Sequence, residues 1–459
     1  MAEGRPIDST PDPTDPNREQ WGSRRGFLLA AAGSAVGLGN LWGFPYKASS
    51  HGGAAFVVVY LLMIVLVCLP LLIAELSIGR RTGESPVMAL FLLGGRRWRW
   101  VGYVLVLNSM MILAFYSVVS GWTLLSLGQN VIGGVPADPA SFFGRISQGP
   151  EALLGHLLAM ALTGMVIFGG IRRGIERLSV SVMPLLYLLL IALAVWASQL
   201  SGAGAGYRFY LQPDFRELLS WSTITAATGH AFFSLSVGLG AMITYASYLR
   251  GRDNLVRLGS VVAAADTTVA LLGGLVTFPL VAHFQLLDGL SDSTIGALFV
   301  AIPSGMNSLG GGGRLVAVVF FLVLAIAALT SAVSLLEVST AGLIDRLGWS
   351  RRRATWLAVL VITLLGIPPA IDNRWIDVAY SLFGEAGLIF GGLMTAILLG
   401  WSYPSLGEAE LAEGFPHPRA IRWWVLLLRW LVTPMLALLL VQSLRQLPAV
   451  LQTFFSHSP

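Results

Sequence analysis

The chain has 459 residues, of which 55% are hydrophobic and 12% are charged, whereas soluble domains average about 25% charged residues. This composition excludes an ordinary soluble domain and predicts a membrane protein, and the single cysteine, Cys68, excludes an internal disulfide. The formal net charge of +5 is spread over short loops, so we expect contact with a lipid bilayer, no nucleic-acid partner and no obligatory protein partner.

The chain begins with a polar stretch, residues 1–20, that is rich in proline and aspartate. This composition predicts a disordered tail rather than a signal peptide. Apolar segments follow, and each is long enough, at roughly 20 residues, to cross a bilayer. Eleven such segments are predicted, at 25–48, 54–79, 101–128, 153–170, 178–199, 222–249, 258–284, 315–344, 354–371, 376–402 and 421–446.

Arginines cluster in alternate loops between these segments. The arginine-rich loops hold Arg80, Arg81, Arg96, Arg97 and Arg99, then Arg172, Arg173 and Arg177, then Arg250, Arg252 and Arg257, and then Arg346, Arg351, Arg352 and Arg353. Positive loops stay in the cytoplasm. We therefore expect a multi-pass protein of the cell's inner (plasma) membrane, with a cytoplasmic N-terminus and an external C-terminal stretch.

Two apolar segments contain the same four residues, Val-Gly-Leu-Gly, at Val36–Gly39 and Val237–Gly240. Glycine in a helix interior costs about 1 kcal/mol relative to alanine. Backbone groups freed at membrane depth also need partners unless they line a cavity. Glycine-interrupted segments at corresponding positions of two halves are typical of the central site of a secondary transporter. The repeat therefore predicts a solute carrier.

The residues around these breaks resemble a known family. Trp21 begins WGSRRG, Ala31–Tyr46 reads AAGSAVGLGNLWGFPY, and Ala231–Tyr248 reads AFFSLSVGLGAMITYASY. With AALTSA at Ala327–Ala332, these motifs are similar to those of the neurotransmitter:sodium symporter family, in its bacterial branch of leucine-transporter-like proteins. The similarity extends from Trp21 to at least Asp345 and weakly through the last segments.

The resemblance implies an all-α membrane protein with about eleven transmembrane helices and two inverted five-helix repeats, whose first and sixth helices are broken. The implied organisation has the tail 1–20, repeats at 21–199 and 222–402, an external loop at 200–221, and a cytoplasmic loop, final helix and external tail at 403–459. The implied activity is not enzymatic. It is symport of an amino acid with Na⁺ by alternating access.

Two sodium sites follow from the resemblance. The first would use the Ala35 carbonyl with Asn40, Ser234 and Asp266. The second would use the carbonyls of Gly33, Val36 and Ala327 with the hydroxyls of Thr330 and Ser331. Without the resemblance, serine and threonine hydroxyls in spans usually bond back to their own helix, and a hydrogen-bonded packing residue is the lesser alternative for Asp266. A membrane-depth carboxylate is nevertheless a functional hypothesis. Because the family's chloride-ligand serine falls on Ala270, we expect Asp266 to supply the negative charge and transport to be independent of chloride.

The resemblance also implies where an amino acid binds. The amides of Leu38 and Gly39 with the Tyr116 hydroxyl would hold the carboxylate, as helix N-termini do. The carbonyls of Ala35, Phe233 and Ser234, with Ser236 nearby, would meet the amine. Gly37 stands where monoamine carriers have an aspartate, which favours an amino acid. The side-chain pocket would comprise Ile112, Tyr116, Val119, Phe233, Leu239, Ser331 and Leu335, and its apolar character favours a neutral, apolar substrate.

Several positions concern the gates. Gly43 and Tyr380 replace the arginine and the acid of the family's outer ion pair, and His230 replaces a glutamine. An inner gate is expected from Arg18, Trp21, Tyr248 and Asp345. Glu75 resembles a buried glutamate that supports the first break.

Two other functions remain open from the sequence. A channel or an amino-acid sensor on the same fold is the alternative to coupled transport, and the missing outer pair slightly favours it. A proton-coupled carrier is less compatible with Thr330 and Ser331. Because the spans contain neither a nucleophile–base pair nor a metal cluster, an integral membrane enzyme is disfavoured.

Overall fold

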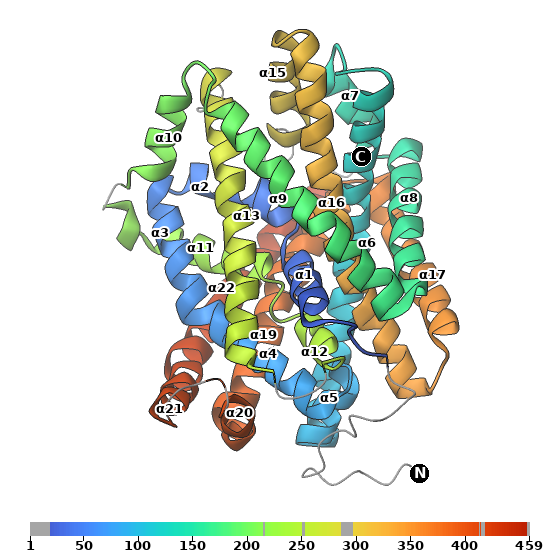
Figure 1. Ribbon diagram of the computed structural model, residues 1–459, viewed down its shortest axis with the longest axis vertical. Helices are drawn as coiled ribbons and strands as arrows, with labels where there is room; N and C mark the ends of the chain where they lie inside the picture. Colours follow the sequence, from blue (N-terminus) through green and yellow to red (C-terminus); the bar gives the residue numbers. More distant parts are fainter. Residues whose placement is uncertain are drawn as a thin grey trace.

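The computed structural model describes residues 19–213, 216–249, 253–285, 297–412, 414 and 418–456. Within these ranges every regular element is a helix, as predicted (Figure 1). Nine helical stretches are long and apolar enough to cross a membrane, and one further pair passes the same test as a bent span. The sixth predicted segment adds two shorter helices, so all eleven predicted segments are helical.

The spanning elements follow the predicted order. The first predicted repeat contains α1 (Arg24–Ala35), η1 (Gly39–Gly43) and α2 (Phe44–Ser50); α3 (Ala54–Met63), η2 (Ile64–Cys68) and α4 (Leu69–Thr82); α6 (Arg96–Ile132); α8 (Pro150–Phe168); and η3 (Ile171–Glu176) with α9 (Arg177–Ala197). The second comprises α11 (Trp221–Ser234) and α12 (Ala241–Ala246); α13 (Leu255–His283); α16 (Gly311–Leu347); α17 (Arg351–Ile371); and α18 (Arg374–Ala379), η6 (Tyr380–Gly387), α19 (Leu388–Ile397) and η7 (Leu398–Ser402). The final helix comprises α21 (Pro418–Leu427), η8 (Leu428–Val432) and α22 (Thr433–Ser456). The repeat boundaries themselves stay a prediction.

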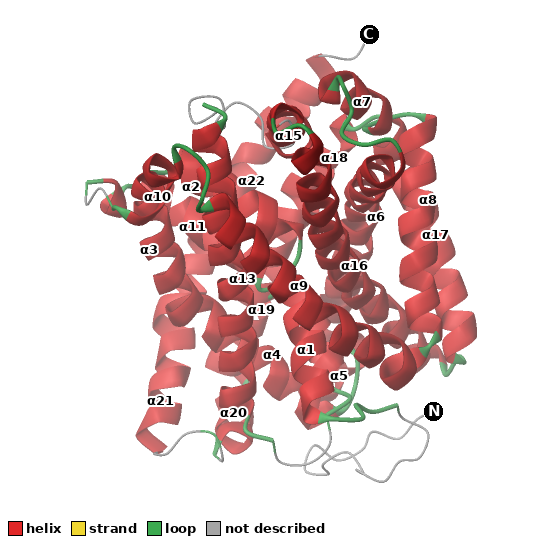
Figure 2. Ribbon diagram, turned by 45° about the horizontal axis from the view of Figure 1, so that its top comes forward, coloured by secondary structure: helices red, strands yellow, loops and turns green. Residues whose placement is uncertain are grey.

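Short helices lie at the two ends of the bundle (Figure 2). One end carries α5 (Pro86–Gly94) and α20 (Pro404–Leu411), near the start of α1. The opposite end carries α7 (Pro139–Ile146), α10 (Ala203–Leu211), η4 (Glu217–Leu219), η5 (Ala297–Ala301) and α15 (Ile302–Ser308). We refer to these as the α5 end and the α15 end.

The broken helices lie in the middle of the bundle. The axes of α1 and the η1–α2 helix differ by 50°, and α1 packs against α9, α13 and α16. Between α11 and α12 the chain adopts positive φ at Ser236, Gly238 and Gly240. A Cβ on Gly238 would lie 2.2 Å from the Leu388 carbonyl oxygen, so this close approach and the left-handed backbone both require glycine.

Large apolar side chains remain exposed on the outward faces of the peripheral helices. Examples are Val65 of η2 at 59% exposure, Leu188 of α9 at 63% and Leu438 of α22 at 60%. In water such a surface would be an aggregation hazard, whereas hydrocarbon is its natural solvent. The exposed apolar faces therefore agree with a bilayer-embedded bundle.

Candidate substrate and sodium sites

A narrow cavity of about 30 Å³ lies where the two breaks face each other. Its walls contain most of the residues expected at the substrate site: Ala35, Gly37, Leu38, Gly39, Ile112, Tyr116, Phe233, Ser234, Ser236, Leu239, Ser331 and Leu335. Asn40 and Leu388 complete the lining. Val119 is buried but does not line this cavity, and Leu388, at the start of α19, was missed because no motif marks it.

Neighbouring side chains satisfy the backbone freed by the first break. The Leu38 amide donates to the Tyr116 hydroxyl at 3.2 Å, and the Gly37 amide donates to Asn40 Oδ1 at 2.9 Å. A Cβ on Gly37 would lie 2.8 Å from Ser331 Oγ and 3.2 Å from the Tyr116 hydroxyl. Glycine at position 37 therefore keeps space open beside the Leu38 amide, which together with the Gly39 amide is expected to meet a carboxylate.

Three of the four residues predicted for the first sodium site form one hydrogen-bonded cluster, and the fourth, Ala35, lines the narrow cavity. Asn40 Nδ2 donates to Asp266 Oδ1 at 2.7 Å, and Ser234 Oγ donates to Asp266 Oδ2 at 2.7 Å. Tyr60 of α3 adds a bond from its hydroxyl to Ser234 Oγ at 3.2 Å; sequence analysis missed it because it lies in a continuous apolar run. Asp266 is fully buried and forms no ion pair with any described residue. A buried ionised carboxylate requires a compensating cation, so this cluster suits one.

The residues predicted for the second sodium site meet between α1 and α16. Ser331 Oγ donates to the Val36 carbonyl at 3.0 Å. Thr330 Oγ1 donates to the carbonyls of Ile326 and Ala327, both at 3.1 Å. The Thr330 bonds are the backbonding expected of threonine in a span, yet they also place its hydroxyl next to the Ala327 carbonyl. Gly33 adjoins this group, since a Cβ there would lie 3.2 Å from Thr330 Cβ.

His230 lies in an aromatic cage outside the narrow cavity. Its ring centroid is 5.9 Å from those of Phe44 and Tyr60 and 6.2 Å from that of Phe56. A Cβ on Gly43 would lie 3.0 Å from His230 Cε1. This contact explains why the two departures occur together, because the histidine ring takes the space beside residue 43.

Glu75 supports the second break rather than the first. The Gly238 amide donates to Glu75 Oε1 at 2.7 Å in a fully buried setting. The expectation that Glu75 serves the first break is therefore wrong. The physical reason is the packing of α4 against α12, which aims the carboxylate at the unwound stretch that precedes α12.

The α5 end holds the residues expected at the inner gate. Trp21 donates from Nε1 to the Tyr245 carbonyl at 2.9 Å, and from its amide to the Tyr248 carbonyl at 3.3 Å. Asp345 accepts from the Ser85 amide at 2.7 Å. Arg18 lies outside the described residues.

Arg351 completes this end and was missed as a site residue. Its guanidinium binds Glu337 in a bidentate pair, at 2.7 and 2.9 Å, and binds Glu19 at 2.6 Å. The Tyr248 hydroxyl donates to the same Glu337 at 2.6 Å. Glu19 also accepts from the Ile171 amide at 2.7 Å. The segment before α1 is thus tied to η3 and α17, and through Arg351 to α16.

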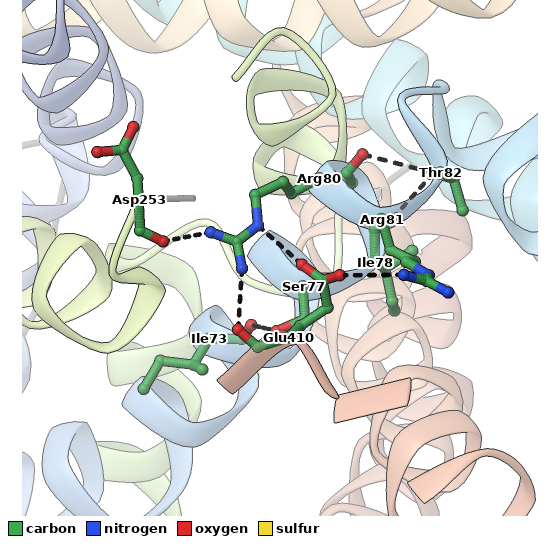
Figure 3. A network of polar contacts seen from close by, with 9 residues as sticks. Ile73, Ser77, Ile78, Arg80, Arg81, Thr82, Asp253 and Glu410 are labelled. Atoms are coloured by element: carbon green, nitrogen blue, oxygen red, sulfur yellow. Dashed lines mark hydrogen bonds and ion pairs between the residues drawn. The ribbon is translucent and has the colours of Figure 1, made fainter. Parts of the chain in front are cut away.

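A second charged network joins α4 to α20 (Figure 3). Arg80 Nε donates to Glu410 at 2.7 Å, and its guanidinium also binds the Asp253 carbonyl. Arg81 lies 3.8 Å from the same Glu410. Arg80 and Arg81, which served in the sequence to predict membrane topology, therefore also join α4 to α20 at the α5 end.

Comparisons with known proteins agree with this geometry. A model of the sodium:neurotransmitter symporter family matches residues 18–137 and 147–456. The uncharacterised sodium-dependent transporter YhdH of Bacillus subtilis is 34% identical over 90% of this chain and 95% of its own length. An uncharacterised sodium-dependent transporter of Methanocaldococcus jannaschii is 34% identical over 76% of this chain and 74% of its own. The crystal structure of MhsT in complex with L-phenylalanine is 36% identical and covers 93% of this chain and 100% of that chain, with a TM-score of 0.85.

The bond between Glu75 and Gly238 gives a stability prediction. Glu75→Ala leaves a buried amide without an acceptor, which costs about 1–3 kcal/mol. Glu75→Gln keeps an acceptor oxygen and should cost less. Thermal unfolding of the detergent-solubilised protein measures both, with Ser77→Ala as a control, since this buried hydroxyl bonds only within α4. Equal stability of the alanine variant and the unsubstituted protein would contradict the assigned role.

Proposed function

We propose that this chain, which belongs to the sodium:neurotransmitter symporter family, imports a neutral, apolar amino acid together with Na⁺ and without chloride. The chain is a sodium-dependent membrane transporter and not an enzyme. The observation that carries the finer proposal is the narrow cavity between the breaks, which adjoins the Asp266 cluster on one side and apolar side chains on the other.

The substrate class follows from the two ends of that cavity. The amides of Leu38 and Gly39 with the Tyr116 hydroxyl suit a carboxylate, and Gly37 leaves room for it. Ile112, Leu239 and Leu335 surround the remaining space and offer no charge to a side chain. MhsT, which was crystallised with L-phenylalanine, supports an amino acid of this class.

Coupling would arise from a shared coordination shell. The substrate carboxylate would complete the shell of the sodium ion held by Ala35, Asn40, Ser234 and Asp266. Each ligand then raises the affinity for the other by the same factor. A sodium ion that moves inward across 100 mV releases about 2.3 kcal/mol, which drives accumulation of the amino acid.

The charge of Asp266 is the basis for independence from chloride. Its carboxylate is buried beside Asn40 and Ser234, and the next turn of α13 carries Ala270, which has no hydroxyl for an anion. A fixed negative charge would balance the sodium ion without a bound halide.

We place the α5 end in the cytoplasm and the α15 end outside. The α5 end carries Arg80, Arg81, Arg346 and Arg351, and positive loops are retained on the cytoplasmic side. The contacts of Trp21, Tyr248 and Glu337 then close the inner side of the narrow cavity.

The second sodium site predicts a changed sodium response. Ser331→Ala and Thr330→Ala each remove one oxygen from the expected site. Each should raise the sodium concentration for half-maximal uptake by about tenfold, which corresponds to a loss of about 1.4 kcal/mol of binding free energy. Ser334→Ala is the control, because its hydroxyl bonds the Ser331 carbonyl on the same helix and is not an expected ligand. An unchanged sodium response in both site variants would contradict the assignment of Thr330 and Ser331 to the second sodium site.

Replacement of chloride by gluconate should leave sodium-driven uptake unchanged at neutral pH. Asp266→Asn removes the fixed charge and should lower uptake, and chloride should restore it only when Ala270→Ser is added to create an anion ligand. Initial rates of labelled amino-acid uptake into proteoliposomes measure this. Loss of uptake by the unsubstituted protein in gluconate would contradict the proposal.

A panel of competitors tests the substrate class. Leucine, valine, methionine or an aromatic amino acid should compete for sodium-dependent binding, with branched aliphatic side chains preferred, whereas their decarboxylated amines should not. Stronger competition by tyramine or tryptamine would overturn the class, and strong competition by glutamate or lysine would show that the pocket is misplaced. Accumulation against a gradient separates a symporter from a channel or a sensor.

A further inference from the structure

A second and larger cavity, of about 370 Å³, lies between α2, α11, η6 with α19, and α22. Its walls hold the two charged side chains Lys47 and Glu385, from the first and tenth segments. Leu388 lines both this cavity and the narrow substrate cavity. The larger cavity is therefore the immediate neighbour of the substrate site, and in the proposed orientation it lies toward the outside.

Aromatic side chains separate the two cavities. Phe233 lines the narrow cavity and Tyr380 lines the larger one, and their ring centroids are 5.6 Å apart in an edge-to-face arrangement. Phe115 lies 6.4 Å from Tyr380 on the other side. The contacts between the two cavities are therefore aromatic packing contacts, and neither Gly43 nor Tyr380 brings a charge.

A charge stands one turn beyond each of these two positions. Lys47 follows Gly43 by four residues, which is one turn of the α-helix. Glu385 follows Tyr380 by five residues within the π-helix η6, where five residues span one hydrogen-bonded turn. Lys47 therefore lies on the same helix face as Gly43, and Glu385 lies on the same face as Tyr380. Both charged residues line the same cavity.

The two charges line the same cavity without touching. Lys47 Nζ lies 6.0 Å from the centroid of the Tyr46 ring, and neither Lys47 nor Glu385 forms an ion pair within the described part of the chain. Two polar atoms that share the cavity, His230 Nε2 and Ser443 Oγ, are buried without a hydrogen-bond partner. Charges and unpaired polar atoms beside apolar walls are costly, so a conformation that paired these groups would remove part of that cost.

We propose that Lys47 and Glu385 form the ion pair that closes the outer path over Phe233 and Tyr380. The inference rests on the proposed transport and orientation. Lys47 lies on the short helix η1–α2, which begins at the first break. The same helix starts with the amides that are expected to meet the substrate carboxylate.

Thiol labelling at the larger cavity tests the pair. The single native cysteine, Cys68, is buried, so Cys68→Ser gives a clean background and Ser443→Cys places a reporter in the cavity wall. In sodium, a saturating amino acid should slow labelling by an uncharged, membrane-impermeant maleimide about tenfold, and Lys47→Gln or Glu385→Gln should remove most of that slowing. The doubly neutralised variant should be no worse than either single one, which is how an interacting pair behaves. Lys47→Glu with Glu385→Lys should restore the slowing.

Two control variants accompany these changes. Asp377→Asn removes an acid two turns before Glu385 that does not line the cavity, and Lys47→Arg keeps the charge; both should retain full slowing. Gln446→Cys serves as a second reporter if the first variant does not fold.

Full slowing in both neutralised variants, or effects that simply add, would overturn the proposed pair. Equilibrium binding of labelled amino acid is measured on the same proteins. Absence of binding by the unsubstituted protein would refute the proposed function instead, and the comparison of labelling in sodium and in potassium would still test the pair.

Discussion

Backbone groups that leave a helix at membrane depth must find other partners, and this requirement organises the centre of the protein. Tyr116 accepts from the Leu38 amide, Asn40 from the Gly37 amide and Glu75 from the Gly238 amide. Ser331 donates to the Val36 carbonyl. Three of these four partners come from helices other than the broken one that they serve, so the two breaks fix the mutual positions of α4, α6 and α16 as well as their own shape.

The sequence could reveal the breaks because their signal is local. The repeated Val-Gly-Leu-Gly places both of them, and the family resemblance identifies Asn40, Ser234 and Asp266, which the structure does bring together. Tyr60 and Leu388 could not be found in the same way. Each lies in a continuous apolar run of the sequence. Which of the residues in such a run faces a break depends on how its helix packs. The Glu75 error has the same origin, since α4 is free in sequence terms to face either break.

Charges show the same limit at longer range. Arg80 and Arg351 were informative as members of positive loops, which need no partner. Arg80 pairs with Glu410 and Arg351 pairs with Glu19, residues that are far apart in the chain, and Arg351 also pairs with Glu337, which precedes it by 14 residues. Nothing local distinguishes these arginines from Arg352 or Arg353. Partner choice is decided by how α4 meets α20 and how α17 meets α16.

Several groups of the central site are already hydrogen-bonded, which constrains what a ligand gains by binding. The Leu38 amide is held by a tyrosine hydroxyl, and the Asp266 oxygens are held by an amide and a hydroxyl. A substrate carboxylate and a sodium ion must therefore exchange partners with these groups rather than fill vacant positions. Exchange of one neutral hydrogen bond for another is nearly balanced, at about 0.5–1.5 kcal/mol, whereas bonds to charged groups are stronger. The net gain therefore depends on charge: the proposed sodium ion is balanced by Asp266, and a substrate carboxylate on the amides gains most beside that bound cation.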